Sequence, residues 1–361
     1  MKQDLEIIRL NLVPGITPRA SAALRERFGD AAGVFRADPG GFAGIPGVGK
    51  SLRARLADPP GLADARREVR RAERLGLSIL HPGDEGYPDP LREIPDPPGV
   101  LYVRGSIPAE GTAAAVVGAR RATVYGRLQA ERFGAGLARG GAIVLSGMAR
   151  GVDGAAHRGA LDAGGLTGAV LGCGLDRVYP PEHRRLAKEI GERGFLLSEQ
   201  PLGAPPRAHH FPMRNRIIAG IATGVVVIEG KLRSGSLITA RLAADFGRYV
   251  FALPGRVDSE LSRGPHSIVR DGAILVDSPD QVLEDLGLKA LTAIEPPPLP
   301  ADPVQAAILS RLAGGETVGV EEILSAAGHT TPAVLAALTA LEVAGRIRMA
   351  PGRRYVLRPL N

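Results

Sequence analysis

Residues 113–146, AAAVVGARRATVYGRLQAERFGAGLARGGAIVLS, decide the fold class of this protein. The stretch opens with a continuous apolar run at 113–117 and closes with another at 142–146, and residues 125–139 between them follow a helical pattern. Apolar runs without alternation are typical of strands that are buried on both faces, as in parallel sheets. The stretch therefore predicts a strand–helix–strand unit with a right-handed crossover.

The same unit recurs along the middle of the chain. Further short apolar runs lie at 167–171, 195–198, 224–228, 249–252 and 273–276, and helical patterns such as 236–246 separate most of them. Strands that alternate with helices build a sheet with helices on both faces. The sequence therefore predicts an α/β fold with a Rossmann-like, doubly wound, mostly parallel sheet.

Two proline-rich stretches punctuate the sequence, at 81–99 and 295–303. The first keeps the apolar residues Tyr87, Leu91 and Ile94, so we expect it to pack on the core, whereas the second predicts a stiff extended spacer. The predicted organisation is a helical domain at 1–75, a Rossmann-like domain at 76–290, a proline-rich linker at 291–303 and a winged-helix domain at 304–361.

The helical N-terminal domain contains a degenerate internal repeat. Pro14-Gly15-Ile16 returns as Pro46-Gly47-Val48, followed by Gly49-Lys50, and each copy leads into a short helical pattern. This arrangement resembles the helix–hairpin–helix units of SAM-like domains, in which backbone N–H groups at a helix start can meet a phosphate. The residues of this possible secondary DNA contact are Gly47, Gly49, Lys50 and Arg53. The alternative is an ordinary αα-hairpin used only for packing.

The C-terminal residues predict a winged helix. Helical patterns at 304–312, 320–326 and 331–344 precede two short strands at 345–349 and 354–357. The third helix of such a module usually enters duplex DNA. Residues 332–344, however, contain no basic side chain and one acidic one, Glu342, which makes a poor phosphate reader. We therefore favour protein contact over DNA contact for this module.

Composition narrows the class of protein further. The 361 residues include 45 basic and 38 acidic ones, and only five of the basic residues are lysine. Arginine suits bidentate phosphate contact, although a GC-rich genome would produce the same bias. A single cysteine, Cys173, excludes an intramolecular disulfide framework and a Cys-rich zinc site. Without a signal peptide or a membrane-spanning apolar run, the chain is expected to be cytoplasmic and free of membranes.

Charge is distributed unevenly. Residues 1–75 hold 14 basic and 9 acidic residues, whereas residues 76–300 hold 25 and 24. A basic surface on the middle domain must therefore come from local clustering. The clearest cluster is RAHHFPMRNR at 207–216, because no acidic residue occurs between Gln200 and Ile228.

Ligands of open α/β sheets bind outside the carboxyl ends of the strands. The loop after the first predicted strand, GARRAT at 118–123, lacks the G-x-G-x-x-G pattern, and the second strand ends in Ser146-Gly147 where a dinucleotide site would have an acid, which argues against such a site. Arg120 and Arg121 beside a helix start still suit a phosphate. Further segments at strand ends are 146–153 with His157, 172–176 with Tyr179-Pro180, 207–216 and 234–236.

The 207–216 segment surrounds one aromatic ring, Phe211, with basic residues. This combination favours single-stranded nucleic acid, because charge follows the backbone while the ring stacks on a base. The alternative is that Phe211 fills the core beneath the loop.

A hydrolase triad of Ser146, Asp153 and His157 is disfavoured, because Ser146 lacks the G-x-S-x-G elbow. Asp153 is interpreted as a helix N-cap and His157 as its structural partner. His209 and His210 have no carboxylate nearby in the sequence to complete a metal site. We therefore expect no catalytic activity, no metal and no cofactor.

Taken together, these segments resemble the DprA/Smf family, the DNA-processing proteins of bacterial transformation. The resemblance covers 100–278 and is carried by VVGARRATVYG, VLSGMARGVDGAAHRGAL, GAVLGCGLDRVYPPEHRRL, LLSEQPLG, HHFPMRNRIIAGIATGVVVIEGKLRSGSLITARLAADFGRYVFALPG and GPHSIVRDGAILV. It implies a homodimer that binds and protects single-stranded DNA and loads the RecA recombinase on incoming DNA during natural transformation and recombination. The chain departs from the family at Ala119, where Ser or Thr is usual, and at Arg207-Ala208, where a lysine is common.

The pattern and the resemblance together predict one set of DNA-binding residues. The set is Arg120, Arg121, Ser146, Gly147, Arg207, His210, Phe211, Arg214, Asn215, Arg216, Lys231, Ser234 and Gly235. The alternative function is a Rossmann-like sensor or enzyme for a small nucleotide or phosphorylated ligand. A weaker alternative is a duplex-DNA regulator that uses the winged helix.

Overall fold

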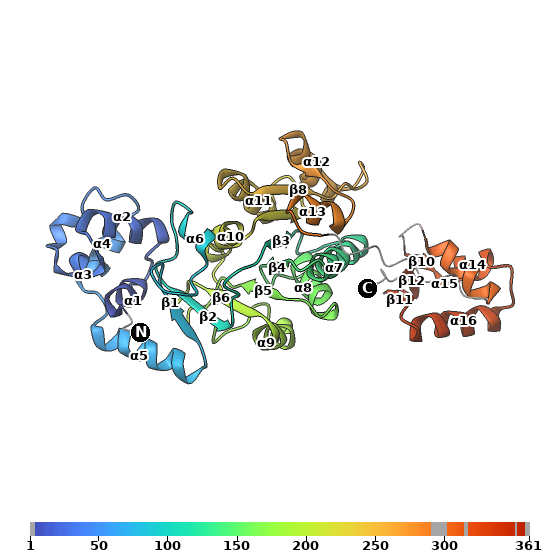
Figure 1. The fold of residues 1–361 in the computed structure, drawn as a ribbon, viewed down its shortest axis with the longest axis horizontal. Helices are drawn as coiled ribbons and strands as arrows, with labels where there is room; N and C mark the ends of the chain where they lie inside the picture. Colours follow the sequence, from blue (N-terminus) through green and yellow to red (C-terminus); the bar gives the residue numbers. More distant parts are fainter. Residues whose placement is uncertain (1–3, 290–301, 314–316, 351, 358–361) are drawn as a thin grey trace.

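The structure is a computed structural model that describes residues 4–289, 302–313, 317–350 and 352–357. Figure 1 shows a helical N-terminal region at one end, a large sheet with its helices in the middle, and a small C-terminal module at the other end. The predicted spacer at 295–303 lies mostly outside the described residues, and its last two, Asp302 and Pro303, begin a helix.

A nine-stranded sheet forms the centre of the molecule. Its order is β1-β2-β6-β5-β4-β3-β7-β8-β9. The last seven strands in this order, β6-β5-β4-β3-β7-β8-β9, run parallel to one another. The strands are β1 (Ser78–Leu80), β2 (Leu101–Gly105), β3 (Ala113–Val117), β4 (Ile143–Ser146), β5 (Thr167–Val170), β6 (Phe195–Ser198), β7 (Gly224–Val227), β8 (Tyr249–Ala252) and β9 (Ile274–Leu275). The prediction of a mostly parallel α/β sheet is confirmed.

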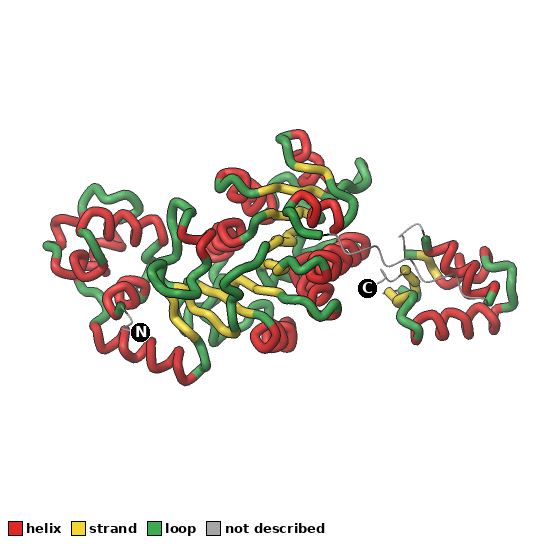
Figure 2. Tube along the Cα trace, viewed as in Figure 1, coloured by secondary structure: helices red, strands yellow, loops and turns green. Residues whose placement is uncertain are grey.

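Helices cover both faces of the sheet (Figure 2). One apolar cluster joins Val116 and Val144 to Phe133 of α7 (Val124–Arg139) and to α8 (Val152–Asp162) and α13 (Pro279–Asp285). A second joins Val117 and Val227 to the other face, where α6 (Asp89–Arg92), α10 (His210–Ile221), α11 (Gly235–Asp245) and α12 (Arg263–Arg270) lie. Side chains of successive strand residues point to opposite faces of a sheet, which explains why the neighbours Val116 and Val117 belong to different clusters.

The strand order reverses between β3 and β7. From β3 the chain moves through β4, β5 and β6 in one direction, using α7, α8 and α9 (Arg184–Arg193) as crossovers, and α10 then returns it to β7 on the other side of β3. Neighbouring loops at such a reversal leave a crevice outside the carboxyl ends of the two strands. The fold therefore predicts a crevice after Val117 and Val227 as the candidate ligand site.

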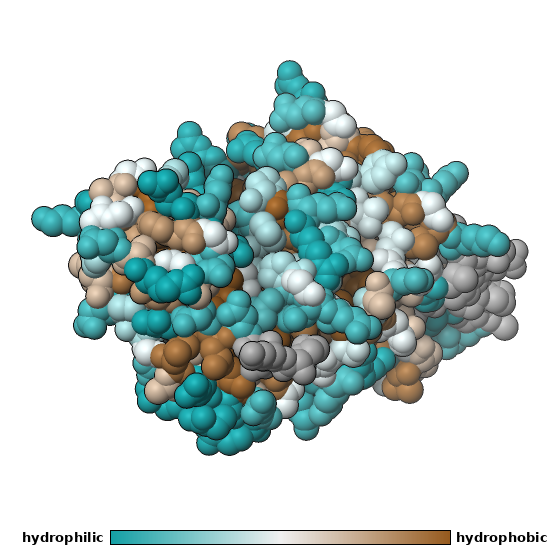
Figure 3. Space-filling model, turned by 60° about the vertical axis from the view of Figure 1, so that its left-hand side comes forward, coloured by the Kyte–Doolittle hydropathy of each residue, from teal (hydrophilic) through white to brown (hydrophobic). Residues whose placement is uncertain are grey.

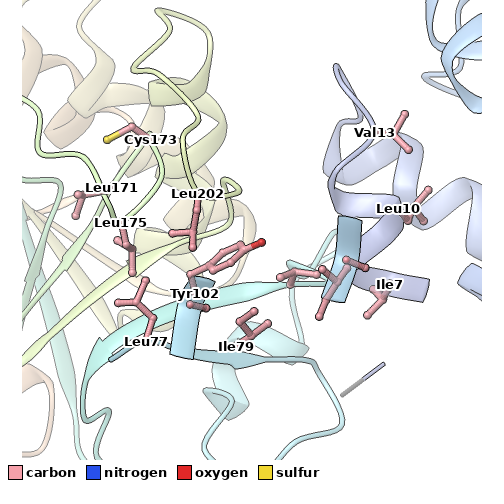
Figure 4. Packing of buried hydrophobic residues seen from close by; sticks show 14 of the residues in the cluster. Ile7, Leu10, Val13, Leu77, Ile79, Tyr102, Leu171, Cys173, Leu175 and Leu202 are labelled. Carbon is pink, nitrogen blue, oxygen red and sulfur yellow. The ribbon is translucent and has the colours of Figure 1, made fainter. Parts of the chain in front are cut away.

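The helical N-terminal region shares its core with the sheet. Figure 4 shows Ile7, Leu10 and Val13 on one side of an apolar cluster, with Tyr102 and Leu202 on the other. The region consists of α1 (Leu5–Asn11), α2 (Pro18–Phe28), α3 (Ala31–Arg36), η1 (Pro39–Phe42), α4 (Lys50–Ala57) and α5 (Leu62–Arg74). The helical region is therefore packed against the sheet domain and shares a hydrophobic core with it.

The predicted turns of the internal repeat both occur. Gly15 and Gly47 have φ of 80° and 79°, a region that favours glycine, and they lead into α2 and α4. The first turn follows the α-helix α1, whereas the second follows the short 3-10 helix η1. The two copies of the repeat therefore differ in the helix that precedes the turn.

The sequence pattern missed the antiparallel edge of the sheet. Strand β2 pairs antiparallel with β6, and β1 pairs antiparallel with β2. Strands of three and five residues next to prolines carry too little periodicity to be recognised. The proline-rich stretch between them packs as expected, because Tyr87, Leu91 and Ile94 are buried.

The C-terminal module is a winged helix, as predicted. Helices α14 (Pro303–Leu312), α15 (Val320–Ala326) and α16 (Thr331–Val343) pack around Ile308, Leu338 and Leu341. Strands β10 (Val318–Gly319), β11 (Ile347–Ala350) and β12 (Arg354–Leu357) form its sheet in the order β10-β12-β11.

The surface is mainly hydrophilic on the face drawn in Figure 3, with smaller hydrophobic patches between polar side chains. Within the described ranges, no helix combines the length and the hydropathy that crossing a membrane would require.

Candidate anion and nucleic-acid site

A hollow of about 600 Å³ lies at the predicted crevice, outside the carboxyl ends of β3 and β7. The loop after β3 (117–121) forms one wall, and the turn after β7 (231–236) forms another. The first turns of α10 close the third side with Phe211, Arg214 and Asn215. Three sequence segments that are far apart in the chain therefore meet here.

A buried carboxylate holds the arginine-bearing loop in place. Glu229, just after β7, accepts hydrogen bonds from the backbone N–H of Thr123 (2.9 Å) and from its hydroxyl (2.5 Å). The same Thr123 oxygen accepts from the Gly126 N–H and so caps α7. Arg120 and Arg121 are exposed on this fixed loop, and neither has an ion-pair partner in the described part of the chain.

Arg214 lies at the floor of the crevice. Its guanidinium donates to the carbonyl of Val170 at the end of β5, while its Nε is buried without an acceptor. Burial lowers the pKa of Arg214 to about 10; the Asp153 carboxylate opposes this shift and the charge of Arg120 adds to it. Arg214 therefore stays protonated at neutral pH and contributes a positive charge at the floor of the crevice.

The rim of the crevice carries an aromatic ring beside a guanidinium. The Cζ atom of Arg120 lies 5.0 Å from the Phe211 ring centroid, and the Tyr179 ring lies 5.5 Å from the same ring. Phe211 is half-buried, so it does not fill the core. Tyr179 was not in the predicted set, although it follows β5 in a segment that the pattern had placed at a strand end.

The turn before α11 supplies backbone donors. Ser234 is the N-cap of α11, but no side chain caps the helix, and the Ser234 hydroxyl instead bonds that of Ser236 (2.7 Å). Asn215 holds this turn by donating to the Gly235 carbonyl (3.1 Å). Lys231 lies at the edge and forms an exposed ion pair with Glu260 (2.8 Å). Free N–H groups at a helix start are suited to anions.

Three predicted contact residues have structural partners instead. Ser146 is fully buried and donates to the Val116 carbonyl (2.6 Å). Gly147 uses its N–H on the Asp153 carboxylate (3.1 Å). Neither polar group is free to meet a ligand in this structure, which therefore gives no support to DNA contact at these two residues.

Arg216 is the third predicted contact residue with structural partners. It is buried and forms ion pairs with Glu199 (2.5 Å) and Asp96 (3.1 Å). The pattern could not reveal these partners, because Asp96 lies 120 residues earlier in the chain.

The interpretation of Asp153 as an N-cap is corrected too. Gly151 is the N-cap of α8, and Asp153 lies in its first turn, where the carboxylate accepts from Gly147 and Ala149. Burial raises the pKa of Asp153, and Arg214 opposes that shift. His157 bonds Thr167 (2.7 Å), so it does not pair with Asp153 and no Ser–His–Asp arrangement forms.

Two predicted residues line a different hollow. Arg207 and His210 face a cavity between α1–α2 and the core. His210 lies 3.1 Å from the Gly172 carbonyl, and burial lowers its pKa. The proposed secondary contact residues Gly47, Gly49, Lys50 and Arg53 lie around the start of α4 and line neither hollow. The structure thus does not bring the whole predicted set together.

The fold and the crevice define a Rossmann-like protein with an arginine-lined hollow at its topological switch point. A family model described as DNA recombination-mediator protein A matches residues 78–287, and one described as DprA winged helix domain matches residues 292–353. The chain belongs to the DprA/Smf family of DNA-processing proteins.

Individual relatives agree with this membership. Protein Smf of Escherichia coli is 44% identical over 289 residues, which are 77% of each chain. The X-ray structure of DNA processing protein A from Streptococcus pneumoniae superposes with a TM-score of 0.66 at 34% identity, covering 79% of this chain and 99% of that one. A structure of the Helicobacter pylori protein, described by its single-stranded DNA binding mode, has a TM-score of 0.53 at 30% identity and covers 58% and 95%.

Proposed function

We propose that this protein binds single-stranded DNA in the crevice between β3 and β7. Phosphates dock on Arg120 and on the N–H groups at the start of α11, and the buried charge of Arg214 attracts them from the floor of the crevice. A base stacks against the ring surface that Phe211 and Tyr179 present. Electrostatic contact supplies affinity, and stacking favours strands whose bases are unpaired.

The observation that carries the proposal is the contact between the Arg120 guanidinium and the Phe211 ring at a crevice that Arg214 also lines. The Cζ atom of Arg120 lies 5.0 Å from the centroid of the Phe211 ring. Arg214 is buried and adds a positive charge beside this pair. The relative from Helicobacter pylori is described as binding single-stranded DNA, which supports the same ligand here.

The wider role follows from family membership. The bound strand is protected and handed to the RecA recombinase during natural transformation and recombination. The protein acts as a homodimer in the cytoplasm and catalyses no reaction. These parts of the proposal rest on the family, whereas the DNA site rests on the geometry of the crevice.

Fluorescence anisotropy of labelled oligo-dT, single-stranded and duplex, across a salt series tests the site. Wild-type protein should prefer single strands, with log affinity falling by about 0.7 per phosphate contact per decade of salt. Arg120→Glu should abolish binding. Phe211→Leu, which keeps apolar volume but removes the ring, should weaken it by about 1–3 kcal/mol.

Arg66→Glu is the matched control, because Arg66 is exposed on α5 and lines neither hollow. Equal binding by wild type and Arg120→Glu would show that the crevice is not the DNA site. Saturation by a mononucleotide with little salt dependence would favour the small-ligand alternative instead.

A further inference from the structure

A second hollow lies directly beside the crevice, between the helical region and the sheet. Its volume is about 300 Å³, and the turn 14–17 between α1 and α2 faces residues 199–201 and 207–210 across it. The segment 207–213 separates the two hollows. Phe211 and Pro212 line the crevice, whereas Arg207, His209 and Met213 line the second hollow.

The walls of this hollow are held rigidly against each other. Asn11 on α1 donates to the Glu199 carbonyl (3.2 Å). On α5, Glu68 accepts from the Tyr102 hydroxyl (2.9 Å) and from the Leu202 N–H (2.7 Å). These bonds link the helical region to the strand ends that form the opposite wall. The hollow is therefore preformed, and an occupant would not need to open it.

The charge of the hollow suits a polyanion. Arg207 is exposed at its edge and has no ion-pair partner in the described ranges of the chain. The one carboxylate among its lining residues, Glu199, is neutralised by Arg216 at 2.5 Å. The remaining lining is largely apolar or aromatic, including His209 and Met213. Rings and apolar surfaces accept nucleobases regardless of their identity.

We propose that single-stranded DNA continues from the crevice over the N-terminal end of α10 into this second hollow, which takes one nucleobase and its sugar. Arg207 then binds the connecting phosphate, and the single-stranded DNA contacts the segment 207–213 on both of its sides. This inference rests on the proposed function. DNA is favoured as the occupant because the hollow continues the DNA site across one short segment.

The size of the hollow agrees with that occupant. Pockets for small organic ligands range from roughly 300 to 1,000 Å³, so this one is at the lower limit. It can accept a single nucleoside but no folded element of another protein.

Ser21→Trp tests the inference, because Ser21 lies on α2 and lines the hollow, which an indole would fill. Anisotropy is measured with oligo-dT of increasing length. For wild type, affinity should rise with length until both hollows are occupied. For Ser21→Trp, the rise should stop earlier, leaving long strands about 5- to 100-fold weaker and the shortest binding strands unchanged. Ser325→Trp, exposed on α15, is the matched control.

Arg207→Glu provides a second variant that does not depend on filling the hollow. It should reduce the salt slope for long strands by about 0.7 and leave short strands unaffected. Loss of affinity at every length, or no change at any length, would contradict the inference. Arg120→Glu separates the two proposals, because it abolishes binding at all lengths if the crevice is the DNA site. If Arg120→Glu weakens binding but Ser21→Trp and Arg207→Glu do not, the crevice is the DNA site and the strand does not extend into the second hollow.

Discussion

At the scale of single residues, His157 is buried as a neutral imidazole that does not take up a second proton. The Thr167 hydroxyl donates to the Val144 carbonyl (2.7 Å), so it must accept from the Nδ1–H of His157 (2.7 Å). The other ring nitrogen, Nε2, is buried without a partner. Burial, followed by the nearby His183, Arg214 and Arg158, lowers the pKa of His157 from 6.5 to about 3.

This shift predicts an acid-sensitive fold. The folded pKa is depressed, so the stability that His157 contributes is present above pH 6.5 and is lost as pH falls from 6.5 toward 3. At about pH 5 the loss should be about 2 kcal/mol. Urea unfolding of wild type and His157→Gln at neutral pH and at about pH 5 measures it. The variant should lose less stability than wild type on acidification; identical losses would contradict the assigned role.

At the scale of elements, the loop between β3 and α7 depends on a close approach between Gly126 and Glu229. A Cβ atom added to Gly126 would lie 2.2 Å from a Glu229 carboxylate oxygen. That carboxylate also accepts both hydrogen bonds from Thr123. Glycine at this position therefore lets the carboxylate reach the loop and fix Arg120 above the crevice.

Gly126→Ala should displace the Glu229 carboxylate and break these bonds. We expect a loss of about 1–3 kcal/mol in the free energy of unfolding, together with weaker single-strand binding. Urea unfolding and anisotropy measure the two effects. Gly83→Ala is the matched control, because its Cβ would meet nothing within 4 Å. A Gly126→Ala protein with wild-type stability would show that the loop tolerates the movement.

At the scale of the whole molecule, the helical region and the sheet form one body. The apolar cluster in Figure 4 contains residues of both, and Glu68 bridges them through Tyr102 and Leu202. The part-buried ion pair of Arg71 with Asp176 (2.7 Å) adds a further link. A shared core is expected to make the two parts unfold together.

Glu68→Ala should loosen this junction. The substitution leaves the Tyr102 hydroxyl and the Leu202 N–H buried without an acceptor, at a cost of roughly 2–4 kcal/mol. Limited proteolysis should then release the helical region faster, and long-strand affinity should fall if the second hollow binds DNA. Glu73→Ala, on the exposed face of the same helix, is the control. Unchanged proteolysis would mean that the apolar cluster alone holds the two parts.

The local architecture follows from the order of residues along the chain. Continuous apolar runs identified the parallel strands, because a strand buried on both faces has no polar side. The loops after those strands had to meet at one edge, which brought Arg120, Phe211 and Ser234 to the same crevice. Only the tertiary structure decided how each arginine of 207–216 is used. Arg207 is exposed to solvent, and Arg214 lies at the floor of the crevice. Arg216 forms ion pairs with carboxylates that are distant in the sequence. Burial and ion pairing depend on segments far apart in the chain, so no local pattern could separate them.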